Sequence, residues 1–370
     1  MPNTIEEKIW KLGFGYMRLP SKDGATDQEL VNRMADKYIE SGGNYFDAAF
    51  VYEGAEVALR ESVIKRHPRE KVHIATKLNI NHLETPEQMA EQFKISIDRL
   101  GADYIDFYLL HGIGPRVGEN IDKLGAWDFL ADLKAKGLIR HMGFSFHGPA
   151  EDLERLLGKY PQAEFCQLQI NYYDWHNKDI DSRRLYEIAR KYDVPVIVME
   201  PVRGGLLASA SSPVAKLLNE ANPKVSLASW ALRYAAQLEG VLVTLSGMST
   251  MEQLNDNLDT IKDFKPLSEE EMAVIDKAVG ILNAVPRVEC TACRYCVKEC
   301  PSEIPIPTLI EIYNDYLIHN NATNLLRTYR LWTRGIGKAC DCTGCRACEG
   351  SCPQNLEIAE TLAKVSALFD

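Results

Sequence analysis

The stretch "VHIATKLNINHLETPEQMAEQFKISIDRLGADYIDFYLLH", residues 72–111, contains one complete strand–helix–strand unit. The runs "VHIATK" (72–77) and "YIDFYLLH" (104–111) are apolar and rich in β-branched or aromatic residues, which is typical of buried strands. Between them, Thr85-Pro86 is a helix start and Gly101 is a helix stop. A helical connection joins neighbouring parallel strands, so the stretch predicts an α/β fold built on a parallel sheet.

Six further apolar runs alternate with helical segments between Trp10 and about Lys262. They are "KLGFGYM" (11–17), "NYFDA" (44–48), "RHMGFSF" (140–146), "FCQLQIN" (165–171), "VPVIVMEP" (194–201) and "VLVTLSG" (241–247). With the two runs above they make eight strands, the number of a (β/α)8 TIM barrel. A doubly wound open sheet is the competing fold, but it requires a G-x-G-x-x-G turn after the first strand, and "GFGYMRLP" does not have that pattern.

The composition restricts the partners and the location. The 370 residues include 42 Lys and Arg against 52 Asp and Glu, and the resulting charge of −10 repels a nucleic-acid backbone. The N-terminal stretch "MPNTIEEKIWKLGFG" has neither the basic nor the apolar part of a signal peptide, and no run of about 18 apolar residues occurs. We therefore expect a cytoplasmic protein that binds neither nucleic acid nor membrane.

The composition changes near residue 284, where the alternation of strands and helices stops. We place a barrel domain at residues 1–284 and a second domain at residues 285–370, which holds nine of the ten cysteines. Two blocks there repeat the spacing C-x2-C-x2-C-x3-C-P: "CTACRYCVKECP" (290–301) and "CTGCRACEGSCP" (342–353). This is the spacing of bacterial two-cluster iron-sulfur proteins, in which the fourth cysteine of a run binds the other cluster.

The repeated spacing therefore predicts two [4Fe-4S] clusters with ligands exchanged between the blocks. One cluster takes Cys290, Cys293, Cys296 and Cys352, and the other takes Cys342, Cys345, Cys348 and Cys300. A pair of zinc sites is the alternative, although zinc has no use for a third cysteine followed by x3-Cys-Pro. A disulfide framework suits short secreted chains rather than this one. Outside both blocks, we expect Cys340 to be a spare thiol and Cys166 a small core residue.

The second domain resembles the two-cluster ferredoxin domain of bacteria over roughly residues 285–370. The resemblance implies a small ferredoxin-like α+β domain, here with a helical insertion in the 41 residues between Cys300 and Cys342. Within the insertion we expect helices at about 307–319 and 322–333. The second of these carries three arginines spaced three and four residues apart, Arg327, Arg330 and Arg334. Such a basic face either docks an acidic partner or, more commonly, is a solvated or intramolecular face.

In a barrel of this kind the reacting groups lie at the C-terminal ends of the strands. Four polar side chains are expected there: Asp47, Tyr52, Lys77 and His111. The ammonium of Lys77 lowers the pKa of a neighbouring tyrosine, while Asp47 holds the lysine in place. His111 would orient a carbonyl or share the proton. Each residue alone is compatible with a structural role, but the four together predict an acid–base device that reduces a carbonyl to an alcohol.

Over about residues 9–280 the sequence resembles the aldo-keto reductase family. The resemblance is carried by "LGFGYMRLP", "NYFDAAFVY", "IATK", "DYIDFYLLHG", "WDFLADLKAKGLIRHMGFSFH" and "LSGMSTMEQLNDNL". The order Asp47, Tyr52, Lys77, His111 matches the catalytic tetrad of that family. Membership implies an NAD(P)H-dependent carbonyl reductase or alcohol dehydrogenase, with nicotinamide lying across the barrel mouth and hydride passing to the substrate carbon.

The same resemblance implies a set of nucleotide contacts. They are Ser145 and Gln167 at the carboxamide, Met199 where many members stack a tyrosine, Gly204 and Gly205 in the pyrophosphate loop, and Gly247, Gln253 and Asn257, of which Asn257 matches an adenine contact.

Several positions depart from the family pattern. Phe146 stands where an asparagine often follows the serine, and Met248 and Gln253 stand where a serine and an arginine commonly bind the 2′-phosphate. Loss of that arginine weakens the preference for NADP(H) over NAD(H), although Arg203 is a possible substitute.

Taken together, the two domains leave three functions open. Clusters carry single electrons whereas nicotinamide exchanges a hydride, so joint turnover needs a converter such as a flavin, and a barrel can hold FMN without a recognisable motif. The first function, which we favour, is an NAD(P)H-dependent carbonyl reductase with structural or regulatory clusters. The second is a ferredoxin-linked oxidoreductase with a ferredoxin or other redox partner. The third is a non-catalytic redox sensor or electron carrier. In the first two cases the substrate is a small carbonyl compound or alcohol.

Overall fold

The computed structural model describes residues 5, 7–81, 83–114, 118–177, 180–210, 212–319 and 322–370. The chain divides into two compact units. The first consists of residues 1–202 and 222–272, and the second of residues 203–221 and 273–370. The segment 203–221 thus groups with the cysteine-rich part, although it lies within the barrel region of the sequence. The domain boundary between residues 284 and 285 stays a prediction.

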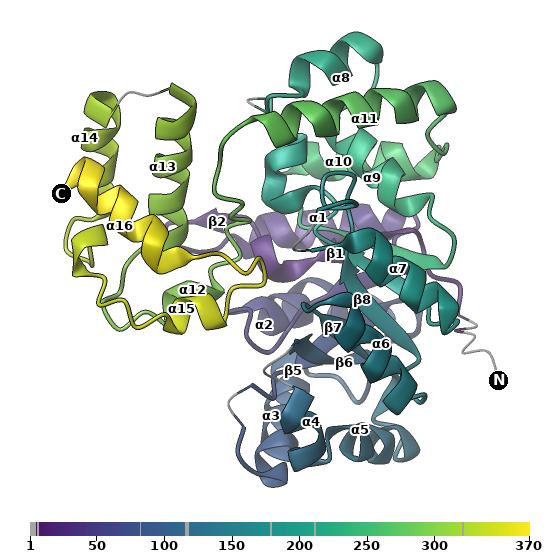
Figure 1. Cartoon of the computed structure of the whole chain (residues 1–370). Helices are drawn as coiled ribbons and strands as arrows, with labels where there is room; N and C mark the ends of the chain where they lie inside the picture. The colour runs from purple at the N-terminus through teal and green to yellow at the C-terminus, as the bar shows by residue number, and fades with distance from the viewer. Residues whose placement is uncertain are drawn as a thin grey trace. The chain divides into compact units, whose positions relative to one another are not determined.

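The first unit is a closed barrel of eight parallel strands, as predicted (Figure 1). In chain order the strands are β1 (Leu12–Gly15), β4 (Tyr45–Asp47), β5 (His73–Leu78), β6 (Ile105–Ile113), β7 (Ile139–Phe146), β8 (Phe165–Gln169), β9 (Val196–Met199) and β10 (Val241–Ser246). Each strand overlaps one of the predicted apolar runs, and β1 closes the ring by pairing with both β4 and β10. A two-stranded antiparallel pair, β2 (Ser21–Lys22) and β3 (Ala25–Thr26), stands apart from this ring.

Helices alternate with the barrel strands. In the first unit they are α1 (Gln28–Glu40), α2 (Ala55–Leu59), α3 (Pro86–Leu100), α4 (Gly118–Leu124), α5 (Ala126–Ala135), α6 (Ala150–Lys159), α7 (Ser182–Lys191), α9 (Leu227–Ala236) and α10 (Met251–Lys262). The expected start and stop of α3 are confirmed: Thr85 and Gln88 form a capping box, and Gly101 adopts the left-handed conformation with φ 61°. Local signals therefore set where this helix begins and ends.

The core of the barrel unit has two layers, because strands buried on both faces alternate their side chains between them. The inner cluster fills the barrel and consists of Tyr45, Ala75, Phe107, Leu109, Phe165, Ile197, Val243 and Leu245. A larger cluster packs the outer strand faces against the helices. Gly143 leaves room for an inner aromatic ring, since a Cβ there would come within 2.7 Å of the ring of Phe165.

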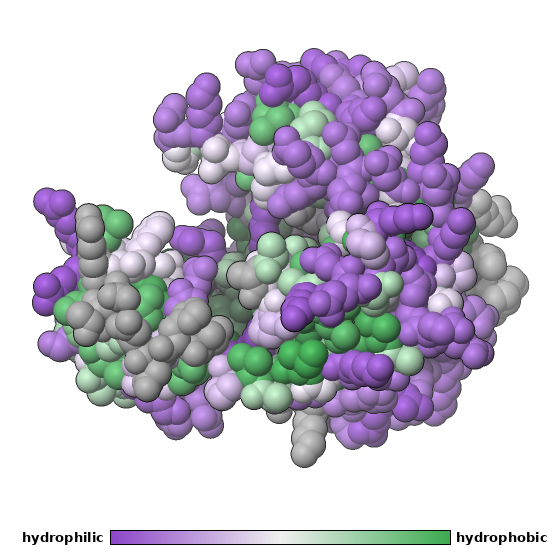
Figure 2. Space-filling view, turned by 90° about the horizontal axis from the view of Figure 1, so that it is seen from above, coloured by the Kyte–Doolittle hydropathy of each residue, from purple (hydrophilic) through white to green (hydrophobic). Residues whose placement is uncertain are grey.

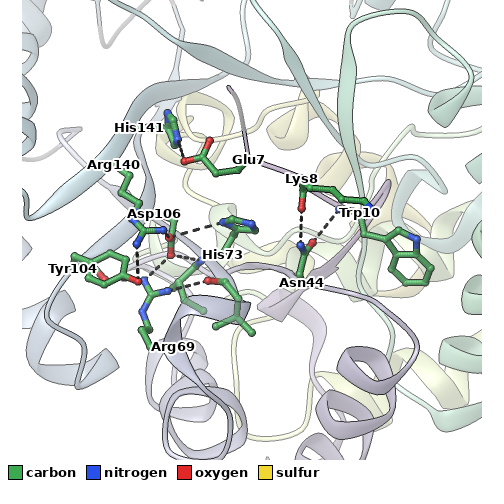
Figure 3. Close-up of polar contacts among 12 residues, drawn as sticks. Glu7, Lys8, Trp10, Asn44, Arg69, His73, Tyr104, Asp106, Arg140 and His141 are labelled. Carbon is green, nitrogen blue, oxygen red and sulfur yellow. Dashed lines mark hydrogen bonds and ion pairs between the residues drawn. The ribbon is translucent and has the colours of Figure 1, made fainter. Parts of the chain in front are cut away.

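The N-terminal ends of the strands are closed by a network of charged and polar groups (Figure 3). The Asn44 side chain accepts the N–H of Trp10 at 2.9 Å and donates to the carbonyl of Lys8 at 2.8 Å. His141, at the start of β7, contacts Glu7 at 2.8 Å, so the segment before β1 is bound to the bottom of the barrel. Ile5 and Ile9 of that segment pack against the inner cluster.

Asp106 is the centre of the same network and is fully buried. Its carboxylate accepts hydrogen bonds from Arg69 at 2.5 Å, from Arg140 at 2.9 Å and from the N–H of Ile74 at 2.9 Å. Both guanidinium groups also lie over the ring of Tyr104, at 4.0 and 4.3 Å from its centroid. At this rim the charged side chains bind one another. This is expected for the N-terminal end of a TIM barrel, which contributes to stability.

The second unit consists of helices and loops in its described residues. Its helices are α8 (Ala215–Ala221), most of α11 (Glu269–Ala284), α12 (Tyr295–Lys298), α13 (Ile306–His319), α14 (Ala322–Trp332), α15 (Ala347–Gly350) and α16 (Ile358–Phe369). The helices expected at 307–319 and 322–333 are α13 and α14. The expected ferredoxin-like domain contributes no strand among the described residues of 285–370, so the β part of the α+β expectation is corrected.

The two cysteine blocks repeat the same backbone conformation, which explains why they do not form strands. Positive φ values recur at equivalent positions, at Ala292 and Gly344, at Arg294 and Arg346, and at Glu303 and Asn355. Each block then enters a helix of one turn, α12 or α15. Left-handed residues turn the chain tightly, and this turning is incompatible with an extended ladder.

The face of the molecule drawn in Figure 2 is largely hydrophilic, in keeping with the charge of −10. Among the described residues, no helix is both long and apolar enough to cross a membrane.

Candidate active site

The four predicted catalytic side chains lie at one end of neighbouring strands. Asp47 is the last residue of β4, Lys77 is next to last on β5, and His111 lies near the end of β6. Tyr52 comes from the loop between β4 and α2. Because the strands are parallel and adjacent, their C-terminal ends bring these residues to the same rim.

Asp47 and Lys77 form a buried ion pair. The Lys77 Nζ donates to Asp47 Oδ1 at 2.6 Å and to the carbonyl of Ala48 at 2.7 Å. Both side chains are almost fully buried, and Asp47 Oδ2 has no hydrogen-bond partner among the described residues. Burial lowers the pKa of Lys77, and the Asp47 charge offsets only part of this effect.

Tyr52 and His111 complete the group. The Lys77 Nζ lies 5.1 Å from the centroid of the Tyr52 ring, and the rings of Tyr52 and His111 meet edge to face at 5.8 Å. Burial, together with the charge of Lys77, holds the pKa of His111 well below its ordinary value. The imidazole is therefore neutral at pH 7 and can donate one N–H to an oxygen at the rim.

A second buried carboxylate, Glu56, holds the loop that carries Tyr52. Glu56 accepts from the Thr76 hydroxyl at 2.7 Å and pairs with Arg99 at 3.3 Å. Arg99 also donates to the carbonyl of Phe50 at 3.2 Å, which ties both sides of Tyr52 to the barrel. Glu56 is not recognisable as functional from the sequence, because a glutamate four residues after Tyr52 looks like any exposed helical glutamate until its burial is known.

The predicted nicotinamide contacts lie on the next strands of the ring, β7, β8 and β9. Ser145 is buried, and its Oγ accepts the N–H of Gly112 at 2.8 Å. Gln167 is also buried, and its Oε1 has no partner among the described residues. Met199 ends β9 and is partly exposed. A buried amide oxygen without a partner is costly, so Gln167 fits a ligand that donates a hydrogen bond, such as a carboxamide.

The remaining predicted contacts of this unit follow β10. The Asn257 amide donates to the Ser246 hydroxyl at 2.9 Å, while its Oδ1 has no partner among the described residues. Gly247 follows Ser246 directly and has no backbone obstruction beside it within 4 Å; only the Cβ of Arg18, at 3.7 Å, would meet a Cβ there. Gln253 is already used locally: its Oε1 accepts the N–H of Ser249 at 2.7 Å, in the cap of α10.

In the second unit, the cysteines gather around two pockets. One pocket has Cys300, Cys342, Cys345 and Cys348 in its wall around about 310 Å³ of space, part of it open to solvent. The other has Cys290, Cys293, Cys296 and Cys352 around about 300 Å³. Each pocket combines three cysteines of one block with the fourth of the other, which is the grouping that the spacing predicts. Four thiols around one space are a donor set that fits an iron-sulfur cluster.

Residues 11–279 match the family model of the aldo/keto reductase family. This chain belongs to that family. Residues 289–357 of this aldo/keto reductase match the 4Fe-4S dicluster domain, so the family barrel is followed by an iron-sulfur module. Its relatives are named as reductases and oxidoreductases, and the chain is an oxidoreductase of this type.

The relatives and solved structures cover the barrel. An aldo-keto reductase of Mycolicibacterium vanbaalenii is 28% identical over 240 residues, which are 64% of this chain and 79% of the relative. The holo form of an aldo-keto reductase from Bacillus halodurans has a TM-score of 0.61 at 26% identity, covering 75% of this chain and 95% of that one. An aldo/keto reductase from Klebsiella pneumoniae, solved in complex with NADP and acetate, has a TM-score of 0.59 at 22% identity, covering 73% and 91%.

The glycine loop of this aldo/keto reductase has its contacts in the second unit. Gly204 and Gly205 have φ values of 64° and 102°, and a Cβ on Gly204 would lie 2.5 Å from the carbonyl oxygen of Thr291. The preceding Arg203 is buried and forms an ion pair with Glu289. Glycine is thus required at position 204 because the loop lies against the first cysteine block. Its predicted role at a pyrophosphate stays a prediction.

Proposed function

We propose that this aldo/keto reductase uses NAD(P)H to reduce an aldehyde or ketone to an alcohol, or runs the reverse reaction, with Tyr52 as the general acid. The observation that carries the proposal is the convergence of the Asp47–Lys77 ion pair with Tyr52 and His111 at the C-terminal rim. A nicotinamide bound beside them would supply the hydride.

Each side chain has a separate task in this proposal. Tyr52 holds the proton that neutralises the developing alkoxide, and the nearby ammonium of Lys77 stabilises the phenolate that remains. Asp47 keeps Lys77 charged and in place despite burial. His111, being neutral, donates a hydrogen bond to the same oxygen and sets its direction.

The proposed coenzyme contacts depend on two buried side-chain amides that fit hydrogen-bond donors of the coenzyme. The carbonyl oxygens of Gln167 and Asn257 lack partners among the described residues and would be satisfied by N–H donors of a nicotinamide carboxamide and an adenine. Ser145, Met199 and Gly247 would line the same site. Gln253 carries no charge and caps α10, so we expect little preference for NADP(H) over NAD(H).

The test of the barrel chemistry compares two tyrosines of one barrel. With purified holoprotein, NADPH and NADH oxidation is measured against a panel of aldehydes and ketones. Tyr52→Phe should reduce kcat/KM by about 10²–10⁴-fold, the usual contribution of a general acid. The matched control is Tyr104→Phe at the opposite rim, which should leave kcat/KM unchanged. Unchanged turnover in Tyr52→Phe would show that Tyr52 is not the acid.

We further propose that the second unit holds two [4Fe-4S] clusters with crossed ligands. Cys290, Cys293, Cys296 and Cys352 bind one cluster, and Cys342, Cys345, Cys348 and Cys300 bind the other. Anaerobic purification with iron, sulfide and zinc quantitation tests this directly. About eight iron atoms per chain are expected, and zinc in place of iron would overturn the assignment.

Double variants distinguish crossed from uncrossed ligands. Cys290→Ser with Cys352→Ser removes two ligands of one cluster in the crossed arrangement, so about half of the iron should remain. Cys290→Ser with Cys300→Ser should damage both clusters. The opposite pattern would show that each block binds its own cluster. Cys340→Ser, outside both pockets, is the control and should keep all of the iron.

The exposed loop of the second cysteine block favours a second candidate function. Residues 343–347 are exposed, and this places Cys345 at the surface where another protein can reach it. In this second function a reduced ferredoxin, rather than NAD(P)H, delivers the electrons, with FMN as the converter. Substrate reduction by reduced ferredoxin without nicotinamide, together with FMN in the purified protein, would favour it. Failure of both would leave the first function.

A further inference from the structure

An exposed patch of apolar and cationic side chains lies at the end of α14 and in the loop after it. The large side chains Leu331, Trp332 and Ile336 are 69%, 53% and 44% exposed, and few other large hydrophobic residues in the described chain are exposed at all. Arg330, Arg334 and Lys338 are exposed among them. We call these six residues the α14 patch. Large apolar groups that cluster in solvent mark a binding surface far more often than single ones do.

The charge of the α14 patch is opposite to that of the chain. From Tyr316 to Cys340 there is no Asp or Glu, while four Lys or Arg occur, in a chain with a net charge of −10. Arg330 and Arg334 form no ion pair with any other described residue, and the side chain of Arg327 lies outside the described set. Acidic groups lie close to the third cation, since the backbone N–H of Lys338 binds Asp341 at 2.8 Å and Asp370 contacts Tyr329. Arg330 and Arg334 are therefore the cations that favour an acidic partner.

The side chains on the other face of this segment are buried and hold the patch in place. Tyr329 stacks on Phe369 with ring centroids 5.3 Å apart, and its hydroxyl contacts Asp370 at 2.8 Å and accepts the N–H of Ala339 at 2.9 Å. The Thr333 hydroxyl donates to the Tyr329 carbonyl at 2.9 Å. A surface that is rigid before binding loses less entropy when a partner docks.

The α14 patch is joined to the cysteine pocket formed by Cys300, Cys342, Cys345 and Cys348. A Cβ on Gly337 would lie 1.9 Å from the carbonyl oxygen of Ser302, so the patch loop packs directly on the chain just after Cys300. The Ser302 hydroxyl donates to the carbonyl of Asp341 at 2.8 Å, next to Cys342. A protein seated on the patch would stand beside this pocket.

We propose that the α14 patch is the docking surface for an acidic one-electron carrier protein, which exchanges electrons with the cluster held by Cys300, Cys342, Cys345 and Cys348. This inference rests on the proposed clusters. One electron moves from the carrier to the cluster, or back, and no bond is made or broken. Trp332 is the apolar centre of the contact, and the cations around it steer the approach of the carrier.

The test measures electron transfer to the full-length holoprotein. The probe is an acidic two-cluster ferredoxin, reduced beforehand, and the rate of cluster reduction is followed by anaerobic stopped flow between low and 0.5 M NaCl. Arg330→Glu with Arg334→Glu should lower the second-order rate about tenfold or more at low salt, and the difference should shrink as salt screens the charges. Trp332→Ser should lower the rate at every salt concentration.

Two controls isolate docking from folding and from cluster assembly. Lys364→Glu reverses one charge at an exposed site on α16 of the same unit, is matched to each single arginine variant, and should keep the wild-type rate. Dithionite, a small reductant that needs no docking surface, should reduce all variants equally, and their iron content should match that of the wild type. Iron-loaded patch variants that accept electrons from ferredoxin at the wild-type rate would overturn the proposal while leaving the clusters intact.

Other occupants of the patch give different results. A wild-type dimer that Trp332→Ser converts to a monomer in sedimentation would assign the patch to a second copy of this chain. Retention on vesicles of phosphatidylglycerol and phosphatidylcholine, lost in the arginine variants, would assign it to a lipid surface. Either result overturns the carrier proposal. Protein without iron would overturn the proposed clusters and the carrier proposal together.

Discussion

Asp47 and Asp106 are two buried aspartates at opposite ends of one barrel, and their environments differ. Asp106, near the start of β6, receives hydrogen bonds from Arg69, Arg140 and the N–H of Ile74. Burial by itself would raise the pKa of Asp106, but the contacts with His73 and Arg69 lower it overall. Burial raises the pKa of Asp47, because Lys77 is its single cationic partner and Oδ2 has none among the described residues.

The difference separates a structural site from a reactive one. At the bottom of the barrel the Asp106 carboxylate is held by two guanidinium groups and a backbone N–H, although the nitrogens Arg69 Nε, His73 Nδ1 and His141 Nδ1 lack hydrogen-bond partners among the described residues. At the top the Asp47 carboxylate has fewer partners, and Asp47 Oδ2 and Gln167 Oε1 lack hydrogen-bond partners among the described residues. Ionisable groups with a shifted pKa, next to buried polar atoms that lack a hydrogen-bond partner, are characteristic of functional sites.

The largest effect is expected from breaking the ion pair at the top. Lys77→Met leaves the Asp47 carboxyl buried without a counter-charge, which should lower stability by about 3–5 kcal/mol and kcat/KM by about 100-fold or more. Anaerobic urea unfolding and steady-state kinetics measure the two effects. The double variant Lys77→Met with Asp47→Asn should recover much of the stability and none of the activity. If Lys77→Met alone were as stable as the double variant, the Asp47 and Lys77 charges would not be coupled energetically.

The next effect tests the bottom of the barrel. Asp106→Asn leaves Arg69 and Arg140 without their buried counter-charge, and we expect a loss of about 3 kcal/mol in unfolding free energy. The kcat/KM measured well below the melting temperature should stay at the wild-type value, because the hydrogen bonds described for Asp106 join it to Arg69, Arg140 and Ile74 and to none of the four rim residues. A matching loss of kcat/KM in the folded variant would contradict the separation of the two ends.

A smaller effect concerns pH. Burial would lower the pKa of His141, but hydrogen bonds with Glu164 and Glu7 raise it overall. The folded protein thus binds this proton more tightly than the unfolded chain does. The stabilisation is complete below about pH 6.5, the ordinary value for histidine, and is lost as the pH rises through the raised pKa.

The measurement compares unfolding free energies of wild type and His141→Gln across pH. The difference should be about 1.5 kcal/mol at pH 6, the usual contribution of a charged hydrogen bond, and should shrink by pH 9. A difference that grows with pH would mean that His141 is neutral in the folded protein.

The smallest effect sharpens the assignment of Gln253. Gln253→Ala removes the bond to Ser249 in the cap of α10 and should cost about 0.5–1 kcal/mol in stability. The ratio of kcat/KM for NADPH to that for NADH should not change, because an uncharged amide gives little to a 2′-phosphate. A changed ratio would place Gln253 at the coenzyme as the family resemblance implies.

Much of the barrel was predictable because its signals are local. The eight apolar runs, the Thr85 start of α3 and the Gly101 stop depend on residues close in sequence. The cysteine grouping was also predictable, since the repeated spacing leaves few ways to surround two clusters. The position of Asp47 and Lys77 followed from their place at the ends of adjacent strands.

The remaining features depend on contacts between distant segments. Glu56 is identified as a support of the Tyr52 loop only by its burial beside Thr76 and Arg99. The family resemblance assigns Gly204 to a coenzyme loop, which stays a prediction, and only the structure shows that its close neighbour is Thr291, 87 residues away in the chain. The β component expected in the second domain is absent from its described residues, because repeated left-handed positions turn the cysteine blocks into loops.

By itself, then, the sequence determined the order of strands, the kinds of reactive side chain and the spacing of the thiols, since all of these are properties of short segments. The tertiary structure alone decided which charges are paired. It surrounded Asp106 with several hydrogen-bond donors and Asp47 with fewer, and it left Trp332 exposed beside Arg330 and Arg334. The physical reason is that burial and electrostatic pairing depend on which distant residues meet, and local periodicity does not record this.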